Sequence, residues 1–158
     1  MDMQAMAAEI RYDEGVRYAP YLDSRGFQTI GVGHNMDAGP LPSWWTFPLT
    51  DDQVNTLLTA DLQSALNDLD DFIPWWAALD DVRQRAMLNL CFNLGWSKFR
   101  EFAQFQSFVK AGAYAAAGQD LGNTPWFKEV GERGPRIVAM IETGFSPYPE
   151  SIYLGANQ

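Results

Sequence analysis

Two carboxylates and a hydroxyl near the N-terminus have the types and spacing that hydrolysis of a glycosidic bond requires. Glu14 precedes Asp23 by nine residues, and Thr29 follows Asp23 by six. One carboxylic acid could donate a proton to the leaving oxygen while the other acts on the opposite face of the sugar. Spacing alone does not establish this chemistry, because most acids in a chain that contains 20 of them are solvated.

A helix, a hairpin and a loop are expected to position these groups. Asp2 can cap a first helix that runs to about Tyr12. Residues 17–22 and 27–32 have the pattern of two strands joined by turn residues, which predicts one hairpin. Residues 35–49 are rich in Pro and Gly and predict a loop.

Helices are expected to form the rest of the fold. A capping box at Thr50 opens a long helix with an apolar stripe, and Pro74 ends it. The next helix, from Asp80, is apolar nearly all round and is expected at the centre of a helical lobe. Shorter helices fit residues 99–111, 113–121 and 135–143. The predicted class is mainly α with one small β-hairpin.

Composition excludes several kinds of site and partner. The 158 residues carry a net charge of −9, with nine acids and no Lys or Arg between residues 26 and 82. A general nucleic-acid binder is not expected, because phosphate contacts need clustered Lys and Arg. A single Cys excludes an internal disulfide and a Cys-rich zinc site. Gly31-x-Gly33 lacks the third glycine of a phosphate loop, and no metal or cofactor is expected.

The start of the chain has neither a basic segment nor an apolar run long enough for a signal peptide or a membrane span. We therefore expect a chain that is made in the cytoplasm and does not insert stably into a membrane. Action outside the cytoplasm would require a separate route of release.

The complete N-terminal motif is more specific than the pair of acids. Residues 13–34 contain the string Asp-Glu-Gly … Tyr-x-Asp-x-x-Gly-x-x-Thr-Ile-Gly-x-Gly-His. This string closely resembles phage lysozymes of the T-even type, in glycoside hydrolase family 24. Similar segments follow at residues 50–61, 79–95 and 124–144, so the resemblance covers roughly residues 3–145.

The resemblance implies one lysozyme-like catalytic domain over residues 1–158, with two lobes around a cleft. The N-terminal lobe, about residues 13–60, would contain the hairpin. The C-terminal helical lobe, about residues 70–145, would also include the N-terminal helix, and residues 146–158 would form a tail. A long helix would join the two lobes of this α+β fold.

The same resemblance implies roles for the three residues of the motif. Glu14 would be the general acid that protonates the glycosidic oxygen between N-acetylmuramic acid and N-acetylglucosamine. Asp23 and Thr29 would hold and polarise the attacking water, as in an inverting enzyme. Glu14 must then carry a proton near neutral pH while Asp23 stays ionised.

Three further residues are expected at the substrate. Asn93 matches a family position that faces the sugar, and the bare backbone at Gly33 suits close approach of a ligand. Arg133 matches an arginine that can pair with the acid, although two extra residues precede it in this chain. A cation favours an ionised carboxylate, so substrate, opening of the cleft or desolvation must counter Arg133 if Glu14 is to act as an acid.

Two ion pairs are implied to be structural. His34 resembles the family histidine that pairs with an acid on the long helix, here Asp61. Asp13 and Arg136 resemble a second pair of this kind. Neither pair is expected to take part in the reaction.

The loop after His34 departs from the T-even members. It is shorter than theirs and contains the adjacent residues Trp44 and Trp45. Adjacent tryptophans near a cleft could stack on sugar rings, but packing in the core of the small lobe is the favoured interpretation.

The resemblance implies a monomeric phage endolysin that acts on the glycan strands of peptidoglycan in host lysis. The enzyme would wait in the host cytoplasm until a holin opens the membrane to the cell wall. Two alternatives stay open. A lytic transglycosylase would cut the same bond with Glu14 alone and leave a 1,6-anhydro end. A catalytically silent peptidoglycan-binding module could use the same scaffold. The presence of Asp23 and Thr29 argues against the transglycosylase, and the intact set of Glu14, Asp23 and Thr29 argues against the silent module.

Overall fold

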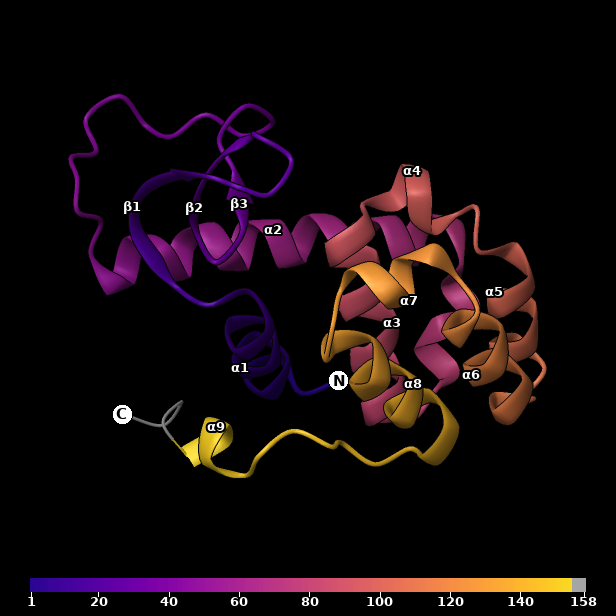
Figure 1. The fold of residues 1–158 in the computed structure, drawn as a ribbon. Coiled ribbons are helices and arrows are strands. Elements are labelled where there is room, and N and C mark those ends of the chain that lie inside the picture. The colour runs from indigo at the N-terminus through magenta and orange to yellow at the C-terminus, as the bar shows by residue number, and fades with distance from the viewer. Residues whose placement is uncertain (155–158) are drawn as a thin grey trace.

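The computed structural model describes residues 1–154, in which a small sheet and a group of helices lie toward opposite ends of one long helix (Figure 1). The elements in chain order are α1 (Met3–Glu14), β1 (Arg17–Leu22), β2 (Gln28–Gly31), β3 (His34–Asn35), α2 (Asp51–Phe72), the 3₁₀ helix η1 (Pro74–Ala78), α3 (Asp81–Leu94), α4 (Trp96–Phe99), α5 (Ala103–Lys110), α6 (Tyr114–Gly122), α7 (Pro125–Glu129), α8 (Arg133–Thr143) and α9 (Ser151–Leu154). The mainly helical class with a small sheet is confirmed. The last residues of the predicted tail, 155–158, lie outside the described residues.

Caps at the N-termini of the first two helices follow the local sequence. The Asp2 carboxylate accepts hydrogen bonds from two N–H groups in the first turn of α1, both at 3.0 Å. The helix continues to Glu14, beyond the predicted end at about Tyr12. Thr50 and Gln53 form the predicted capping box at the start of α2. These local signals place Glu14 at a helix end and give the long helix its start.

The sheet has three antiparallel strands in the order β1-β2-β3, one more than the predicted hairpin. The third strand is two residues long and pairs Ile30 with His34. So short a strand has no alternating pattern that could predict it. Between β1 and β2, Tyr21 lies opposite Thr29, which brings Thr29 next to the turn that begins at Asp23.

Helix α3 is buried at the centre of the helical group, as predicted. Met87, Leu88 and Leu90 have no exposed surface, and the polar Arg85 and Asn89 are buried with them. Helices α2 and α8 pack against α3, so polar groups on α3 can reach both neighbours.

The helix predicted over residues 99–111 is shorter in the structure, where α5 covers residues 103–110, because the chain turns between α4 and α5. The Gln106 side chain donates to the Phe99 carbonyl at 2.8 Å and so satisfies the end of α4. Helix α7 lies outside the helices predicted from the sequence. Proline suits the first position of a helix, and Thr124 caps α7 by accepting from the Phe127 N–H.

The prediction of core packing is wrong for Trp44, which is 78% exposed. Trp45 is partly buried and packs against the core. The Trp45 N–H donates to the Pro42 carbonyl at 3.0 Å, so both tryptophans lie in one turn. Neither ring lines the cavity between the sheet and α2.

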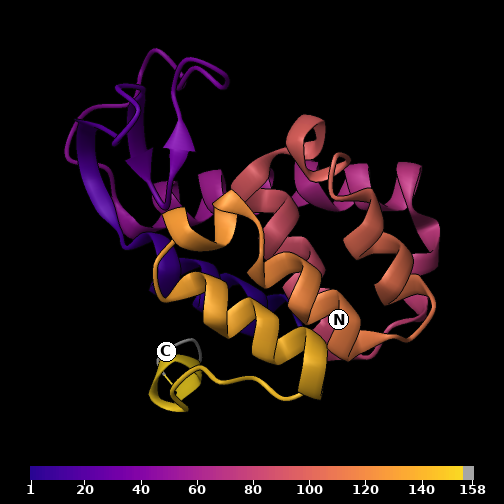
Figure 2. The same ribbon diagram turned by 45° about the vertical axis from the view of Figure 1, so that its right-hand side comes forward.

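The segment after α8 runs back across the molecule, so that α9 lies beside α1 (Figures 1 and 2). Tyr148 in this segment is 5% exposed. Among residues 1–154, no helix has both the length and the apolar character to cross a bilayer.

Candidate active site

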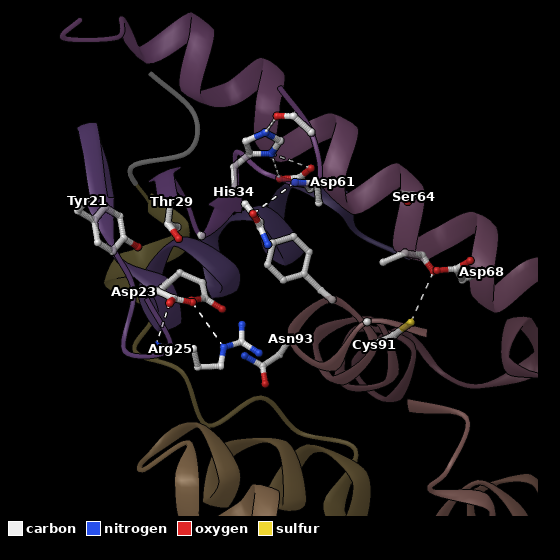
Figure 3. A pocket seen from close by; sticks show the side chains of 18 residues that line it. Tyr21, Asp23, Arg25, Thr29, His34, Asp61, Ser64, Asp68, Cys91 and Asn93 are labelled. Carbon is white, nitrogen blue, oxygen red and sulfur yellow. Dashed lines mark hydrogen bonds and ion pairs between the residues drawn. The ribbon is translucent and has the colours of Figure 1, made fainter. Parts of the chain in front are cut away.

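A cavity of about 490 Å³ lies between the sheet, α2 and the C-terminal end of α3 (Figure 3). Side chains of the sheet and of α2 form two of its sides. The predicted site residues in its lining are Glu14, Asp23, Thr29, Gly33, His34, Asp61 and Asn93. The predicted residues Asp13, Arg133 and Arg136 lie outside this lining. Residues from four separate parts of the chain therefore meet at one place.

Glu14 is the last residue of α1, and the chain turns sharply after it. Gly15 has a φ of 71°, and its N–H bonds to the Arg11 carbonyl at 2.9 Å. The Glu14 side chain is 24% exposed and accepts a hydrogen bond from Arg133 Nη1. A methyl group added at Gly33 would lie 3.3 Å from Glu14 Oε2. Glycine at this position therefore allows the backbone to approach the carboxylate directly.

Arg133 lies behind Glu14 and is only 5% exposed. Its Nε donates to Asn89 Oδ1 at 2.8 Å and lies 3.4 Å from Asp13 Oδ2. The fully buried side chain of Asp13 also accepts from Arg136 Nη2 at 2.8 Å. The structure thus contains both the Asp13–Arg136 pair and the Glu14–Arg133 pair. Substrate contact by Arg133 stays a prediction, because it would require Arg133 to leave these partners.

Asp23 begins the hairpin turn, and that turn holds its carboxylate. Oδ1 accepts from the N–H groups of Arg25 at 2.8 Å and Phe27 at 2.9 Å, and Arg25 Nε lies 3.5 Å from Oδ2. The Phe27 N–H is the main cause that holds the pKa of Asp23 below its ordinary value, and Arg25 adds to this effect. Asp23 therefore stays ionised into the acidic range.

Thr29 is 4% exposed and lies on the same side of the cavity as Asp23 (Figure 3). Its hydroxyl donates to the Phe27 carbonyl at 3.0 Å. Because this bond uses the one hydroxyl proton, Thr29 Oγ1 is left as an acceptor toward the cavity. The hairpin therefore presents two kinds of acceptor, a carboxylate and a hydroxyl oxygen.

His34 joins β3 to α2. Its Nδ1 lies 2.8 Å from Asp61 Oδ2, and its Nε2 lies 2.6 Å from the Gly39 carbonyl oxygen. The bond to Asp61 chiefly raises the pKa of His34, although burial opposes this. Two acceptors around the ring suit an imidazolium that donates from both nitrogens. These contacts fit the structural role expected from the sequence.

Asn93 lines the cavity near the end of α3, and its Oδ1 accepts from Trp126 Nε1 at 2.8 Å. This bond orients the side-chain amide and leaves its NH₂ group as the donor offered to a ligand.

Burial raises the pKa of the nearby Cys91 to about 12. The Cys91 thiol therefore stays protonated and is unsuited to nucleophilic chemistry.

The lining contains four carboxylates, from Glu14, Asp23, Asp61 and Asp68, and one arginine, Arg25. This chemistry suits proton transfer and activation of a water. In the part of the chain that the structure describes, no group of three or more His, Cys, Asp or Glu side chains is placed to hold a metal ion.

Sequence reasoning assigned no site role to Asn89 or Tyr148. Asn89 is fully buried and donates to Asp13 at 3.0 Å, while the Tyr148 hydroxyl donates to Asp13 at 2.6 Å. Asn89 interrupts an apolar run over residues 86–92, and this was a usable signal. No local pattern distinguishes Tyr148, because its partner is 135 residues away.

Comparison with known proteins identifies the family of the chain. The model of the phage lysozyme family matches residues 11–139. The chain belongs to the phage lysozyme family. The resemblance carried by the N-terminal motif is therefore confirmed, and the protein is a lysozyme hydrolase.

Relatives of this lysozyme come from phages and from an amoeba. A probable T4-type lysozyme of Dictyostelium discoideum is 24% identical over 85% of this chain and 92% of its own length. The pre-baseplate central spike protein of Enterobacteria phage T4 is 26% identical over 89% of this chain, which spans only 28% of that protein. The endolysin of Salmonella phage P22 is 34% identical over 57% of this chain and 60% of its own length.

Proposed function

We propose that this lysozyme hydrolyses the β-1,4 bond between N-acetylmuramic acid and N-acetylglucosamine in peptidoglycan, with inversion at the anomeric carbon. The observation that carries the proposal is that Glu14, Asp23 and Thr29, from different elements, line the same cavity. Glycosidases use two carboxyl groups of this kind on opposite sides of the bond that is cut. Membership of the phage lysozyme family supports the peptidoglycan substrate.

Glu14 serves as the general acid in this proposal. It lies partly exposed at the cavity, with the Gly33 backbone beside its carboxylate and Arg133 behind it. A sugar in the cavity would displace water from the carboxylate and so favour its protonated form. Arg133 Nε also lies 3.4 Å from Asp13 Oδ2. The Arg133 guanidinium can therefore pair with Asp13 when Glu14 is protonated. Glu14 then donates its proton to the glycosidic oxygen.

Asp23 and Thr29 position the attacking water. Two backbone N–H groups occupy Asp23 Oδ1, and Thr29 Oγ1 is left as an acceptor. A water that donates one hydrogen bond to Asp23 and one to Thr29 directs a lone pair away from both, toward the sugar. Asp23 takes up the proton of this water as its oxygen attacks the anomeric carbon.

In this proposal the lysozyme acts as a monomeric endolysin in host lysis. It stays in the host cytoplasm until a holin opens the membrane, and then reaches the peptidoglycan. The similarity to the P22 endolysin supports the assignment. Sedimentation analysis tests the monomer, and expression with and without a co-expressed holin tests the route of release.

Analysis of the products tests the reaction itself. Wild type and Glu14→Gln are each incubated with purified peptidoglycan, and the soluble fragments are analysed by mass spectrometry. Reducing N-acetylmuramic acid ends from the wild type alone support hydrolysis through Glu14. Anhydro ends would instead identify a lytic transglycosylase, and binding to the wall without any fragments would identify a silent binding module. NMR of the first product anomer decides between inversion and retention.

A further inference from the structure

The C-terminal segment, residues 145–154, places two tyrosine hydroxyls on carboxylates of α1. Tyr148 donates to Asp13 Oδ2 at 2.6 Å, and Tyr153 donates to Glu9 Oε1 at 2.7 Å. Both acceptor side chains have no exposed surface. The two contacts are chemically alike, but only Asp13 adjoins the acid Glu14 in sequence and shares an arginine with it.

Asp13 collects hydrogen bonds from three other parts of the fold. Its Oδ1 accepts from Arg136 Nη2 at 2.8 Å. Its Oδ2 accepts from Asn89 Nδ2 at 3.0 Å as well as from Tyr148, and Arg133 Nε lies 3.4 Å away. The shorter bonds of Tyr148 and Asn89 thus occupy the oxygen that faces Arg133. Arg133 makes its closer contact with Glu14 instead.

We propose that Tyr148 is a positioning residue that sets how Arg133 is divided between Asp13 and Glu14, and so sets the pH range in which Glu14 holds its proton. The inference rests on the proposed role of Glu14 as general acid. Without the Tyr148 hydroxyl, Asp13 Oδ2 loses a donor and attracts Arg133 more strongly. Arg133 then withdraws from Glu14, whose protonated form persists to higher pH.

The charged and titratable groups in the network around Glu9, Asp13 and Glu14 come from α1, α3, α8, the hairpin and the C-terminal segment. They are Glu9, Asp13 and Glu14 of α1, Arg85 of α3, Arg133 and Arg136 of α8, Tyr21 of the hairpin, and Tyr12 and Tyr148, which stack edge to face. Burial raises the pKa of Tyr148, so its hydroxyl stays a donor throughout the range in which carboxylates titrate. A change in pH therefore alters the carboxylates before it alters Tyr148.

The test compares Tyr148→Phe with Tyr153→Phe. Both variants remove one tail hydroxyl from a carboxylate of α1, so both carry a similar structural loss. ¹³C NMR of the Glu14 carboxyl, assigned with Glu14→Gln, follows its titration in the free protein. We expect the midpoint to rise by about half a pH unit or more in Tyr148→Phe. The alkaline limb of the pH–rate profile should move to higher pH by the same amount. Tyr153→Phe should change neither the Glu14 midpoint nor the position of this limb.

A double-mutant cycle separates this effect from general loosening. In the Asp13→Asn background, Tyr148→Phe should cause no further displacement of the Glu14 midpoint, because the competing carboxylate is gone. An unchanged midpoint in Tyr148→Phe, or an equal displacement in Tyr153→Phe, would overturn the proposal. If Tyr148→Phe does not fold, the Asp13→Asn variant alone tests the proposal. Without the competing carboxylate, Arg133 should stay with Glu14, and the Glu14 midpoint should be lower than in wild type. The titration does not depend on turnover, so a lack of peptidoglycan hydrolysis would count against the proposed function alone.

Discussion

Glu14 and Asp23, two of the four carboxylates that line the cavity, are held in opposite ways. Asp23 lies in an exposed hairpin turn, and its partners are N–H groups and an arginine within four residues of it. Glu14 lies where helices meet, and its partner Arg133 comes from a helix 119 residues later. The turn at Asp23 can therefore form locally, whereas the surroundings of Glu14 exist only in the folded chain.

This difference separates two tasks of the proposed reaction. A base must stay ionised, and backbone N–H groups in a turn achieve this without help from the rest of the fold. An acid must gain a proton and lose it again, which requires a charged neighbour that can be shared with another group. The network of Asp13, Asn89 and Arg133 behind Glu14 provides such sharing.

The largest effect is expected from the carboxylates themselves. Glu14→Gln should lower kcat by a factor on the order of 10³ or more, and Asp23→Asn by a factor of about 10². The rates are measured as reducing ends released from purified peptidoglycan, with circular dichroism to confirm folding. Asp23→Asn keeps an acceptor for the turn, so its melting temperature should stay close to that of wild type. Equal rates in wild type and Asp23→Asn would contradict the assignment of the base.

Ion pairs in the two regions should differ in their contribution to stability. Arg85 donates to the fully buried Glu9 at 2.6 Å, and Arg85→Ala should cost about 3–5 kcal/mol in the free energy of unfolding. Arg25, whose side chain is 64% exposed, pairs with Asp23, and Arg25→Ala should cost about 0–1 kcal/mol. Urea denaturation measures both. Similar losses in the two variants would show that burial does not distinguish these pairs.

The buried pair also predicts a dependence on pH. Burial raises the pKa of Glu9, while Arg85 opposes this. An acid with a raised pKa in the folded state destabilises the fold as the pH rises above its unfolded value, because the unfolded chain releases the proton first. The loss in Arg85→Ala should therefore be larger at pH 8 than at pH 5. A loss that does not vary with pH would contradict this reading of Glu9.

A smaller effect is expected from the glycine beside Glu14. Gly33 and Gly112 have φ values of 75° and 72°, so alanine at either position should cost about 1 kcal/mol in stability. At Gly33 the new methyl group would also press on the Glu14 carboxylate, whereas Gly112 has no neighbour within 4 Å of that point. Gly33→Ala should lower kcat about tenfold, and Gly112→Ala should leave it unchanged. Equal activity in the two variants would contradict a positioning effect on Glu14.

The smallest effect is expected from the pair that joins the sheet to α2. The bond to Asp61 raises the pKa of His34, so the pair should stabilise the fold fully below the ordinary value of 6.5. This contribution should decrease as the pH rises through the pKa of His34 in the folded state. The difference in unfolding free energy between wild type and His34→Gln should therefore be larger at pH 6 than at pH 9. Asp61→Asn is the control, and it should show the same trend.

Local patterns predicted the parts of the fold that depend on a few neighbouring residues. The caps at Asp2 and Thr50 and the hairpin turn at Asp23 were all visible in the sequence. The packing of side chains against the core could not be predicted in the same way. Trp44 and Trp45 have the same chemistry and adjacent positions, yet one is exposed and the other is partly buried. Periodicity could not show this difference, because it depends on how the loop lies against the core.

The sequence by itself determined the family and indicated the groups of the proposed reaction, because the motif from Asp13 to His34 is fixed by short spacings along the chain. The tertiary structure alone decided what surrounds Glu14. Arg133 approaches it from the first turn of α8, and the Tyr148 hydroxyl reaches the neighbouring Asp13 from the C-terminal segment. The physical reason is that bonds within a turn follow from local geometry, whereas buried charges find their partners through the packing of distant helices.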